Sequence, residues 1–127
     1  MKFFIIDDDS DIIDFMATLL EAEGHSVSSE IAGATAISRI VKQIPDCVLT
    51  DLMMADVDGL DLCRELRNRQ NLQGLKIVFV SARTSEYWQK RARESGANGY
   101  ITKPLNSGTF VSPVERINGE TDPSEGP

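Results

Sequence analysis

The sequence predicts an α/β domain in which a five-stranded parallel sheet has helices on both faces. Short apolar runs, typical of strands buried on both sides, alternate with longer segments whose apolar residues recur at helical spacing. Strands that alternate with helices form a doubly wound sheet with right-handed crossovers. The chain of 127 residues is long enough to bury one hydrophobic core.

Five segments have the composition of strands. The first is the unbroken apolar run FFII, and the fourth is rich in β-branched residues. The second is more polar, so we expect it at an edge of the sheet. The predicted strands cover residues 3–6, 25–30, 47–50, 76–80 and 100–102.

Four amphipathic segments between these strands have clear helix boundaries. The first helix can be capped by Asp9 or Ser10 and stops at Gly24, and the second ends before Pro45. The predicted helices cover residues 10–23, 34–43, 59–68 and 86–95.

A fifth helix would start near Ser107, and Gly108 weakens it. Pro113 would interrupt its hydrogen bonds, and if Pro113 lies in the first turn instead, the helix is very short. The helix would bury three apolar side chains, Phe110, Val114 and Ile117. We expect a domain of residues 1–117, followed by a disordered acidic tail or linker at 118–127, because that segment has almost no apolar residues.

Composition narrows the possible functions. The net charge of −7 gives no electrostatic basis for binding nucleic acid or an anionic membrane. Basic residues in two stretches, including Arg67 and Arg93, are expected on solvated helix faces. Two cysteines are too few for a disulfide framework and favour a cytoplasmic location. The apolar run before Asp7 is too short for a signal peptide or a membrane span.

Four charged residues follow directly after apolar runs. Asp7 and Asp8 follow FFII, Asp51 follows CVLT and Lys103 follows YIT. In an open parallel sheet the carboxyl ends of the strands form the edge where ligands bind. Three carboxylates at that edge repel one another and favour a divalent cation, which indicates a site for Mg²⁺ and a phosphoryl group.

These residues belong to five motifs in a fixed order: IIDDD, TDLMMADVDG, VSA, GY and TKP. In these motifs the chain resembles response-regulator receiver domains, and it is similar to the chemotaxis-type single-domain regulators. The resemblance covers residues 1 to about 117. It implies a flavodoxin-like fold with the strand order 2-1-3-4-5.

The resemblance also implies roles for the acidic residues. Asp51 is expected to be the phosphoacceptor and to form an aspartyl phosphate. Asp8 is expected to bind Mg²⁺ directly and Asp7 through a water molecule. Asp51 and the backbone carbonyl of Met53 would complete the protein ligands.

Other positions are expected to support phosphorylation and to report it. Lys103 would neutralise the phosphoryl oxygens, its peptide bond to Pro104 would be cis, and Ser81 would donate a hydrogen bond to the phosphoryl group. Tyr100 matches the family's aromatic switch residue, which turns inward on phosphorylation. Its alternative is a half-buried ring with its hydroxyl in water.

Trp88 allows two interpretations, and the sequence does not decide between them. An exposed Trp88 beside Tyr100 would form a surface for partner docking. Alternatively, Trp88 packs against Ala92 within the domain. The sequence also departs from the family at Ala55, where proline is common, so the loop after Asp51 is expected to be looser.

The predicted function is a phosphoacceptor module of a two-component or phosphorelay pathway. A histidine kinase or histidine phosphotransfer protein would donate the phosphoryl group, and a downstream effector could receive the signal. The domain would catalyse only its own phosphorylation and dephosphorylation. One alternative is a pseudo-receiver that binds partners without phosphorylation. Another is a phosphatase of the haloacid-dehalogenase type, which is disfavoured because Asp51 is followed two residues later by Met53 rather than Asp.

Overall fold

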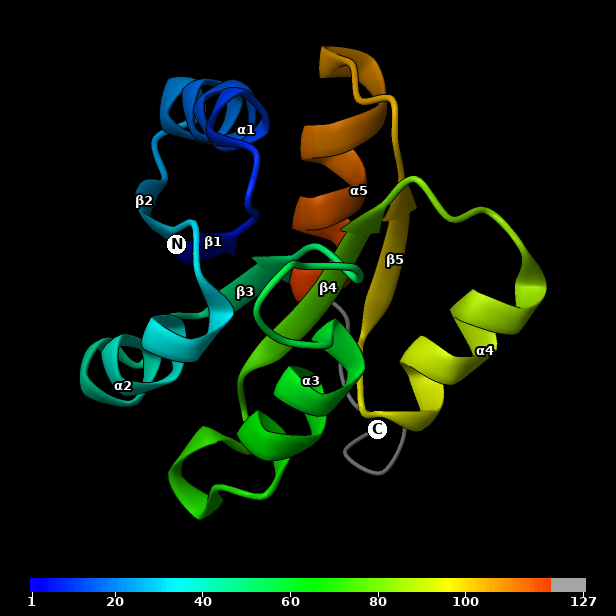
Figure 1. Cartoon of the computed structure of the whole chain (residues 1–127). Coiled ribbons are helices and arrows are strands. Elements are labelled where there is room, and N and C mark those ends of the chain that lie inside the picture. Colours follow the sequence, from blue (N-terminus) through cyan, green and yellow to red (C-terminus); the bar gives the residue numbers. More distant parts are fainter. Residues whose placement is uncertain (120–127) are drawn as a thin grey trace, which may run out of the picture.

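The structure, a computed structural model, describes residues 1–119 and confirms the predicted fold class. Five parallel strands form one sheet in the order β2-β1-β3-β4-β5, as expected (Figure 1). The strands are β1 (Lys2–Ile6), β2 (Ser26–Glu30), β3 (Cys47–Thr50), β4 (Lys76–Ser81) and β5 (Gly99–Thr102).

Helices cover both faces of this sheet. On one face lie α1 (Ser10–Ala22) and α5 (Ser107–Gly119), and the other face is covered by α2 (Gly33–Gln43), α3 (Gly59–Arg67) and α4 (Glu86–Glu94). Within residues 1–119, no helix has the length and apolar character needed to cross a bilayer.

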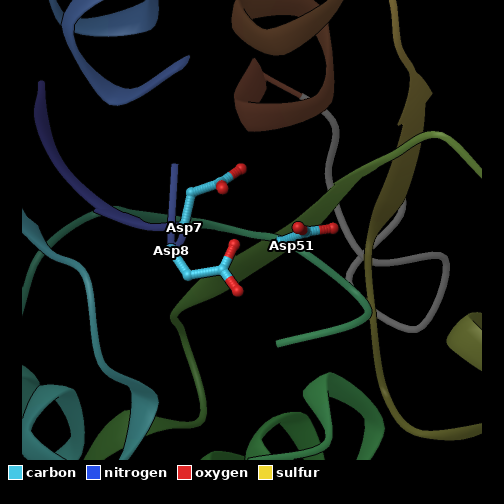
Figure 2. A group of neighbouring side chains, drawn as sticks. All are labelled: Asp7, Asp8 and Asp51. Carbon is cyan, nitrogen blue, oxygen red and sulfur yellow. The ribbon is translucent and has the colours of Figure 1, made fainter. Parts of the chain in front are cut away.

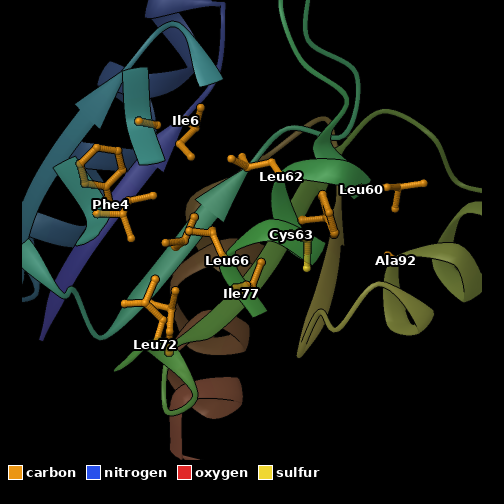
Figure 3. Packing of buried hydrophobic residues seen from close by; sticks show 14 of the residues in the cluster. Phe4, Ile6, Leu60, Leu62, Cys63, Leu66, Leu72, Ile77 and Ala92 are labelled. Carbon is orange, nitrogen blue, oxygen red and sulfur yellow. The ribbon is translucent and has the colours of Figure 1, made fainter. Parts of the chain in front are cut away.

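Two hydrophobic clusters lie on opposite sides of the sheet. Because successive side chains of a strand point to opposite faces, Phe4 and Ile6 of β1 enter the cluster beneath α2 and α3, which Figure 3 shows. Phe3 and Ile5 enter the cluster beneath α1 and α5. This double burial explains why the central strands are unbroken apolar runs.

Apart from shifts of one residue at the ends of elements, the structure differs from the predicted elements in two places. A short 3₁₀ turn, η1 (Gln70–Leu72), lies between α3 and β4 and buries Leu72. In addition, α5 continues through Pro113 to Gly119, so the alternative of a very short fifth helix is wrong. The predicted tail begins inside this helix, and its remainder at 120–127 lies outside the described residues.

Arg67 is a structural residue, so its assignment to a solvated helix face is wrong. Its Nε donates to the carbonyl of Gly96 at 2.8 Å, and one Nη donates to the carbonyl of Leu75 at 2.6 Å. The other Nη donates to Asn98 Oδ1 at 2.6 Å. These bonds join the end of α3 to the segments that precede β4 and β5, and they help to place β5 in the sheet.

We predict that Pro113→Ala raises the free energy of unfolding by about 1–2 kcal/mol, part of the cost of a proline inside a helix. Alanine supplies the missing backbone N–H in the middle of α5. Urea denaturation followed by circular dichroism measures the change. The control is Ser112→Ala, an exposed neighbour that changes helix propensity without changing the backbone hydrogen bonds. A Pro113→Ala variant less stable than wild type would contradict this prediction.

Candidate functional site

The register of the sheet brings the predicted acidic residues together. Ile6 at the end of β1 pairs with Thr50 at the end of β3, and Thr50 pairs with Phe79 of β4. Asp7 and Asp51 follow these paired residues directly. They therefore leave the sheet side by side at its carboxyl-terminal edge, where open parallel sheets bind ligands.

Three carboxylates form the centre of this edge. One oxygen from each of Asp7, Asp8 and Asp51 lies within 4.8 Å of the others, and Figure 2 shows the three side chains together. Asp7 is buried, Asp8 is exposed to solvent and the Asp51 side chain is 13% exposed. The cluster is thus closed on the side of Asp7 and open on the side of Asp8.

Lys103, which follows β5, reaches two of these carboxylates. Its Nζ lies 3.0 Å from Asp7 Oδ2 and 3.5 Å from Asp51 Oδ2. The backbone N–H of Lys103 donates to the carbonyl of Ser81 at 2.8 Å, and its peptide bond to Pro104 is cis. The lysine is therefore held at the edge by its backbone as well as by its charge.

Burial and neighbouring charges shift the pKa of Asp51, and likewise that of Lys103, in opposite directions. Burial raises the pKa of Asp51, although Lys103 partly offsets this effect. Burial alone would lower the pKa of Lys103, but its contacts with Asp7 and Asp51 outweigh burial and raise the pKa. Lys103 is therefore firmly cationic, whereas the negative charge of Asp51 is maintained at a cost.

The donor set fits a small divalent cation. Three carboxylates face one ammonium group, so the edge has an excess of negative charge. Mg²⁺ binds oxygen ligands at about 2.0–2.1 Å, which places opposite ligands about 4 Å apart. One oxygen from each of the three carboxylates lies within 4.8 Å of the others, so a single ion can be held among them, and the open side at Asp8 gives a hydrated ion access.

The loop at 52–58 after β3 folds back tightly beside Asp51. The backbone N–H of Gly59 donates to the carbonyl of Leu52 at 2.9 Å, and Met53 forms an isolated antiparallel bridge with Asp58. A Cβ on Gly59 would lie 2.6 Å from the Asp51 carbonyl oxygen, so only glycine allows this close approach. These contacts hold the loop in place, although Ala55 lacks the rigidity of proline.

Ser81 and Tyr100 are linked through the backbone of one residue. Buried Ser81 accepts a hydrogen bond on Oγ from the Arg83 N–H at 3.1 Å. The Tyr100 hydroxyl donates to the Arg83 carbonyl at 2.7 Å, and its ring lies 6.4 Å from that of Phe79. Tyr100 is half-buried and its hydroxyl has a protein partner at an exposed position, so the ring fits both the switch position and the alternative of a half-buried ring with a solvated hydroxyl.

The aromatic residues of α4 do not form the exposed surface of Trp88 and Tyr100 that the sequence left open. Trp88 is half-buried and packs on the same cluster as Ala92 and Tyr100, which agrees with the packing interpretation. The exposed ring on this helix is Tyr87, which lies edge-on to Trp88 at 5.1 Å. Tyr87 was not identified from the sequence, because its helical spacing is that of an ordinary surface residue.

Sequence reasoning also missed Asp56, which contacts α2 from the 52–58 loop. Its two carboxylate oxygens accept hydrogen bonds from the backbone N–H groups of Gly33 and Ala34 at 3.2 and 3.0 Å. The residue before α2, Ala32, offers no side-chain cap. The N–H groups of a first helical turn need acceptors. The absence of a capping side chain at Ala32 was therefore the sequence signal that a residue elsewhere in the chain, here Asp56, caps α2.

The fold and this edge together define a doubly wound α/β domain with a cluster of three carboxylates and a lysine at the carboxyl ends of its strands. The family model for the response regulator receiver domain matches residues 3–115. The chain therefore belongs to the receiver-domain family of two-component response regulators, as the motifs predicted.

Known relatives support this assignment. The chain is 30% identical over 116 residues to the phosphate regulon transcriptional regulatory protein PhoB of Rhizobium meliloti (strain 1021). The match covers 91% of this chain but 51% of PhoB, so the chain spans about half the length of that relative.

Solved structures agree in fold. A putative response regulator from Chloroflexus aurantiacus J-10-fl superposes with a TM-score of 0.88 at 27% identity, covering 94% of this chain and 98% of that one. The chemotaxis response regulator CheY4 of Vibrio cholerae gives a TM-score of 0.87 at 22% identity, covering 91% and 97%. The likeness to a chemotaxis protein therefore extends to the fold alone.

We predict that Asp51→Asn raises the melting temperature at pH 7 in EDTA by a few degrees. Burial raises the folded-state pKa of Asp51 above its unfolded value of about 3.9, so folding becomes less favourable as pH rises through that window. Asparagine cannot ionise and escapes this cost. In thermal melts between pH 3 and pH 8, the difference in melting temperature between Asp51→Asn and wild type should shrink toward pH 3.

Mg²⁺ provides the control for this experiment. Saturating Mg²⁺ should stabilise wild type more than Asp51→Asn, because a ligand stabilises the state that binds it. An Asp51→Asn variant less stable than wild type at pH 7 in EDTA would contradict this explanation.

Proposed function

We propose that the domain accepts a phosphoryl group on Asp51 in a Mg²⁺-dependent reaction and thereby switches a partner-binding surface near Tyr100. The observation that supports this most directly is the position of Lys103 Nζ, 3.0 Å from Asp7 and 3.5 Å from Asp51. A lysine ammonium beside a partly exposed carboxylate suits a site where a phosphoryl group adds negative charge.

The reaction would proceed by direct displacement. An ionised oxygen of Asp51 attacks the phosphorus of a phosphohistidine, the P–N bond breaks with its electron pair leaving on the imidazole, and an aspartyl phosphate forms. Lys103 then shares its charge between Asp7 and the new phosphoryl oxygens. Ser81 already accepts a hydrogen bond from Arg83, which leaves its own proton for a phosphoryl oxygen.

Asp8, Asp51 and the Met53 carbonyl would hold Mg²⁺, with Asp7 acting through a water molecule. Bound Mg²⁺ supplies positive charge to the phosphoryl oxygens during transfer. The three acidic residues support this assignment because one oxygen from each can face a common point.

The link between Ser81 and Tyr100 suggests how phosphorylation would reach the surface. If Ser81 moves toward the phosphoryl group, its bond to the Arg83 N–H is strained or lost. The Tyr100 hydroxyl is bonded to the same residue, so the ring would shift with it. Trp88 packs on the same cluster and would take part in the changed surface. Two states with different contacts at one site are the requirement for such a switch.

A histidine kinase or a histidine phosphotransfer protein would donate the phosphoryl group, and a downstream effector would bind the switched surface. The acidic domain itself is proposed not to bind nucleic acid or membrane. Two buried free cysteines, Cys47 and Cys63, agree with a cytoplasmic location. The alternatives of a pseudo-receiver and of a small phosphatase are not favoured, because the acidic set is complete and the family is that of receivers.

Incubation with acetyl phosphate and Mg²⁺, followed by intact-mass spectrometry, tests this function. Wild type should gain one phosphoryl group, and Asp51→Asn should gain none at the same site. The matched control is Asp61→Asn, an exposed aspartate of α3 whose loss should leave labelling unchanged. Equal labelling of Asp51→Asn and wild type would refute the assigned site, and unlabelled wild type would favour the pseudo-receiver.

A second prediction concerns the lifetime of the aspartyl phosphate. Met53 is 43% exposed in the loop that follows Asp51, where the bulk of its side chain would shield the acyl phosphate from water. Met53→Asn should therefore speed dephosphorylation several-fold, while its backbone carbonyl is kept. Loss of the added mass over time measures the rate, and an unchanged decay would rule out shielding by Met53.

A further inference from the structure

Asp56 joins the loop that carries Met53 to the first turn of α2. Its carboxylate accepts hydrogen bonds from the first two residues of α2, at 3.2 Å from the Gly33 N–H and 3.0 Å from the Ala34 N–H. The N–H of Ala34, above all, holds the pKa of Asp56 below its usual range. The contact is thus made by the ionised carboxylate.

A second contact lies next to the first. Gly33 is buried, and a Cβ placed on it would overlap the Cγ2 of Val57. Met54 is also close to this position and packs on the core cluster. The loop is therefore docked on the first turn of α2 at two points, one polar and one apolar.

The other side of the same loop carries the cation ligand. Met53 bridges to Asp58, Asp58 Oδ1 accepts from the Leu60 N–H at 2.8 Å, and Gly59 closes the loop onto Leu52. The base of the loop is thus attached to α3, whereas its tip is attached to α2 through Asp56. With both attachments made, the Met53 backbone has little freedom to move relative to Asp51.

We propose that Asp56 is a positioning residue for the cation site: by docking the 52–58 loop on α2, it fixes where the Met53 carbonyl lies relative to Asp8 and Asp51. This inference rests on the proposed function, in which that carbonyl binds Mg²⁺. Asp56 acts through the loop and does not touch the ion. Residues that orient metal ligands affect affinity strongly without being ligands themselves.

Mg²⁺ titration of the whole chain by isothermal calorimetry tests the proposal. Asp56→Ala removes both acceptors and should weaken Mg²⁺ binding about tenfold. Asp56→Asn keeps one acceptor and caps helices nearly as well as aspartate, so it should lose at most about threefold. Gly33→Ala should weaken binding in the same direction by displacing Val57, although Asp56 is intact.

Two controls separate positioning from other effects. Asp61→Asn removes an exposed negative charge in the first turn of α3 without changing the 52–58 loop, and it should leave Mg²⁺ affinity unchanged. Ser38→Gly destabilises α2 at an exposed position without altering its cap, so it should lower the melting temperature but not the affinity. If Asp56→Asn and Asp56→Ala weaken binding equally, the effect is one of charge and the proposal fails.

The proposal also fails if Asp56→Ala melts at a lower temperature yet binds Mg²⁺ as wild type does. If the proposed function itself is wrong, wild type will show no Mg²⁺ binding and no labelling by acetyl phosphate. That outcome differs from the two results that would refute the role of Asp56.

Discussion

At the carboxyl-terminal edge of the sheet, the single ammonium group of Lys103 faces the carboxylates of Asp7 and Asp51, with Asp8 beside them. One positive charge cannot balance three negative ones, and the excess is tolerable only where solvent or a cation can reach it. The parallel register creates this arrangement, because the strands that precede Asp7 and Asp51 end in paired rows. The two apolar clusters matter to function mainly because they hold that register.

Two loops connect the charged edge to the rest of the molecule. After β4, the Arg83 N–H donates to Ser81 and the Arg83 carbonyl accepts from Tyr100. The Tyr100 ring packs against the same cluster as Trp88 of α4, and both rings are half-buried. After β3, Asp56 attaches the loop of Met53 to the start of α2. We propose that the contacts of Arg83 transmit a change at the site to the surface near Tyr100, whereas the contacts of Asp56 hold the Met53 carbonyl in position.

The strands and the edge residues were predictable from the sequence, because buried parallel strands leave unbroken apolar runs and place charges directly after them. What the sequence did not reveal depends on partners far along the chain. Arg67 is held by residues that follow it by 8 to 31 positions, and Asp56 caps a helix that begins 23 positions earlier. The sequence left the course of α5 open between a helix through Pro113 and a very short one. The longer helix forms because Phe110 and Val114 are buried against the sheet and tertiary packing outweighs local helix propensity.

A crystal structure of the protein with Mg²⁺ and beryllofluoride, an analogue of a phosphoryl group, would show whether Asp51 accepts the phosphoryl group beside a cation. We expect the adduct on an Asp51 carboxylate oxygen, the cation bound by Asp8, Asp51 and the Met53 carbonyl, and Lys103 Nζ within hydrogen-bond distance of a fluoride. An adduct on another residue would contradict the proposed role of Asp51, as would a cation bound without Asp51.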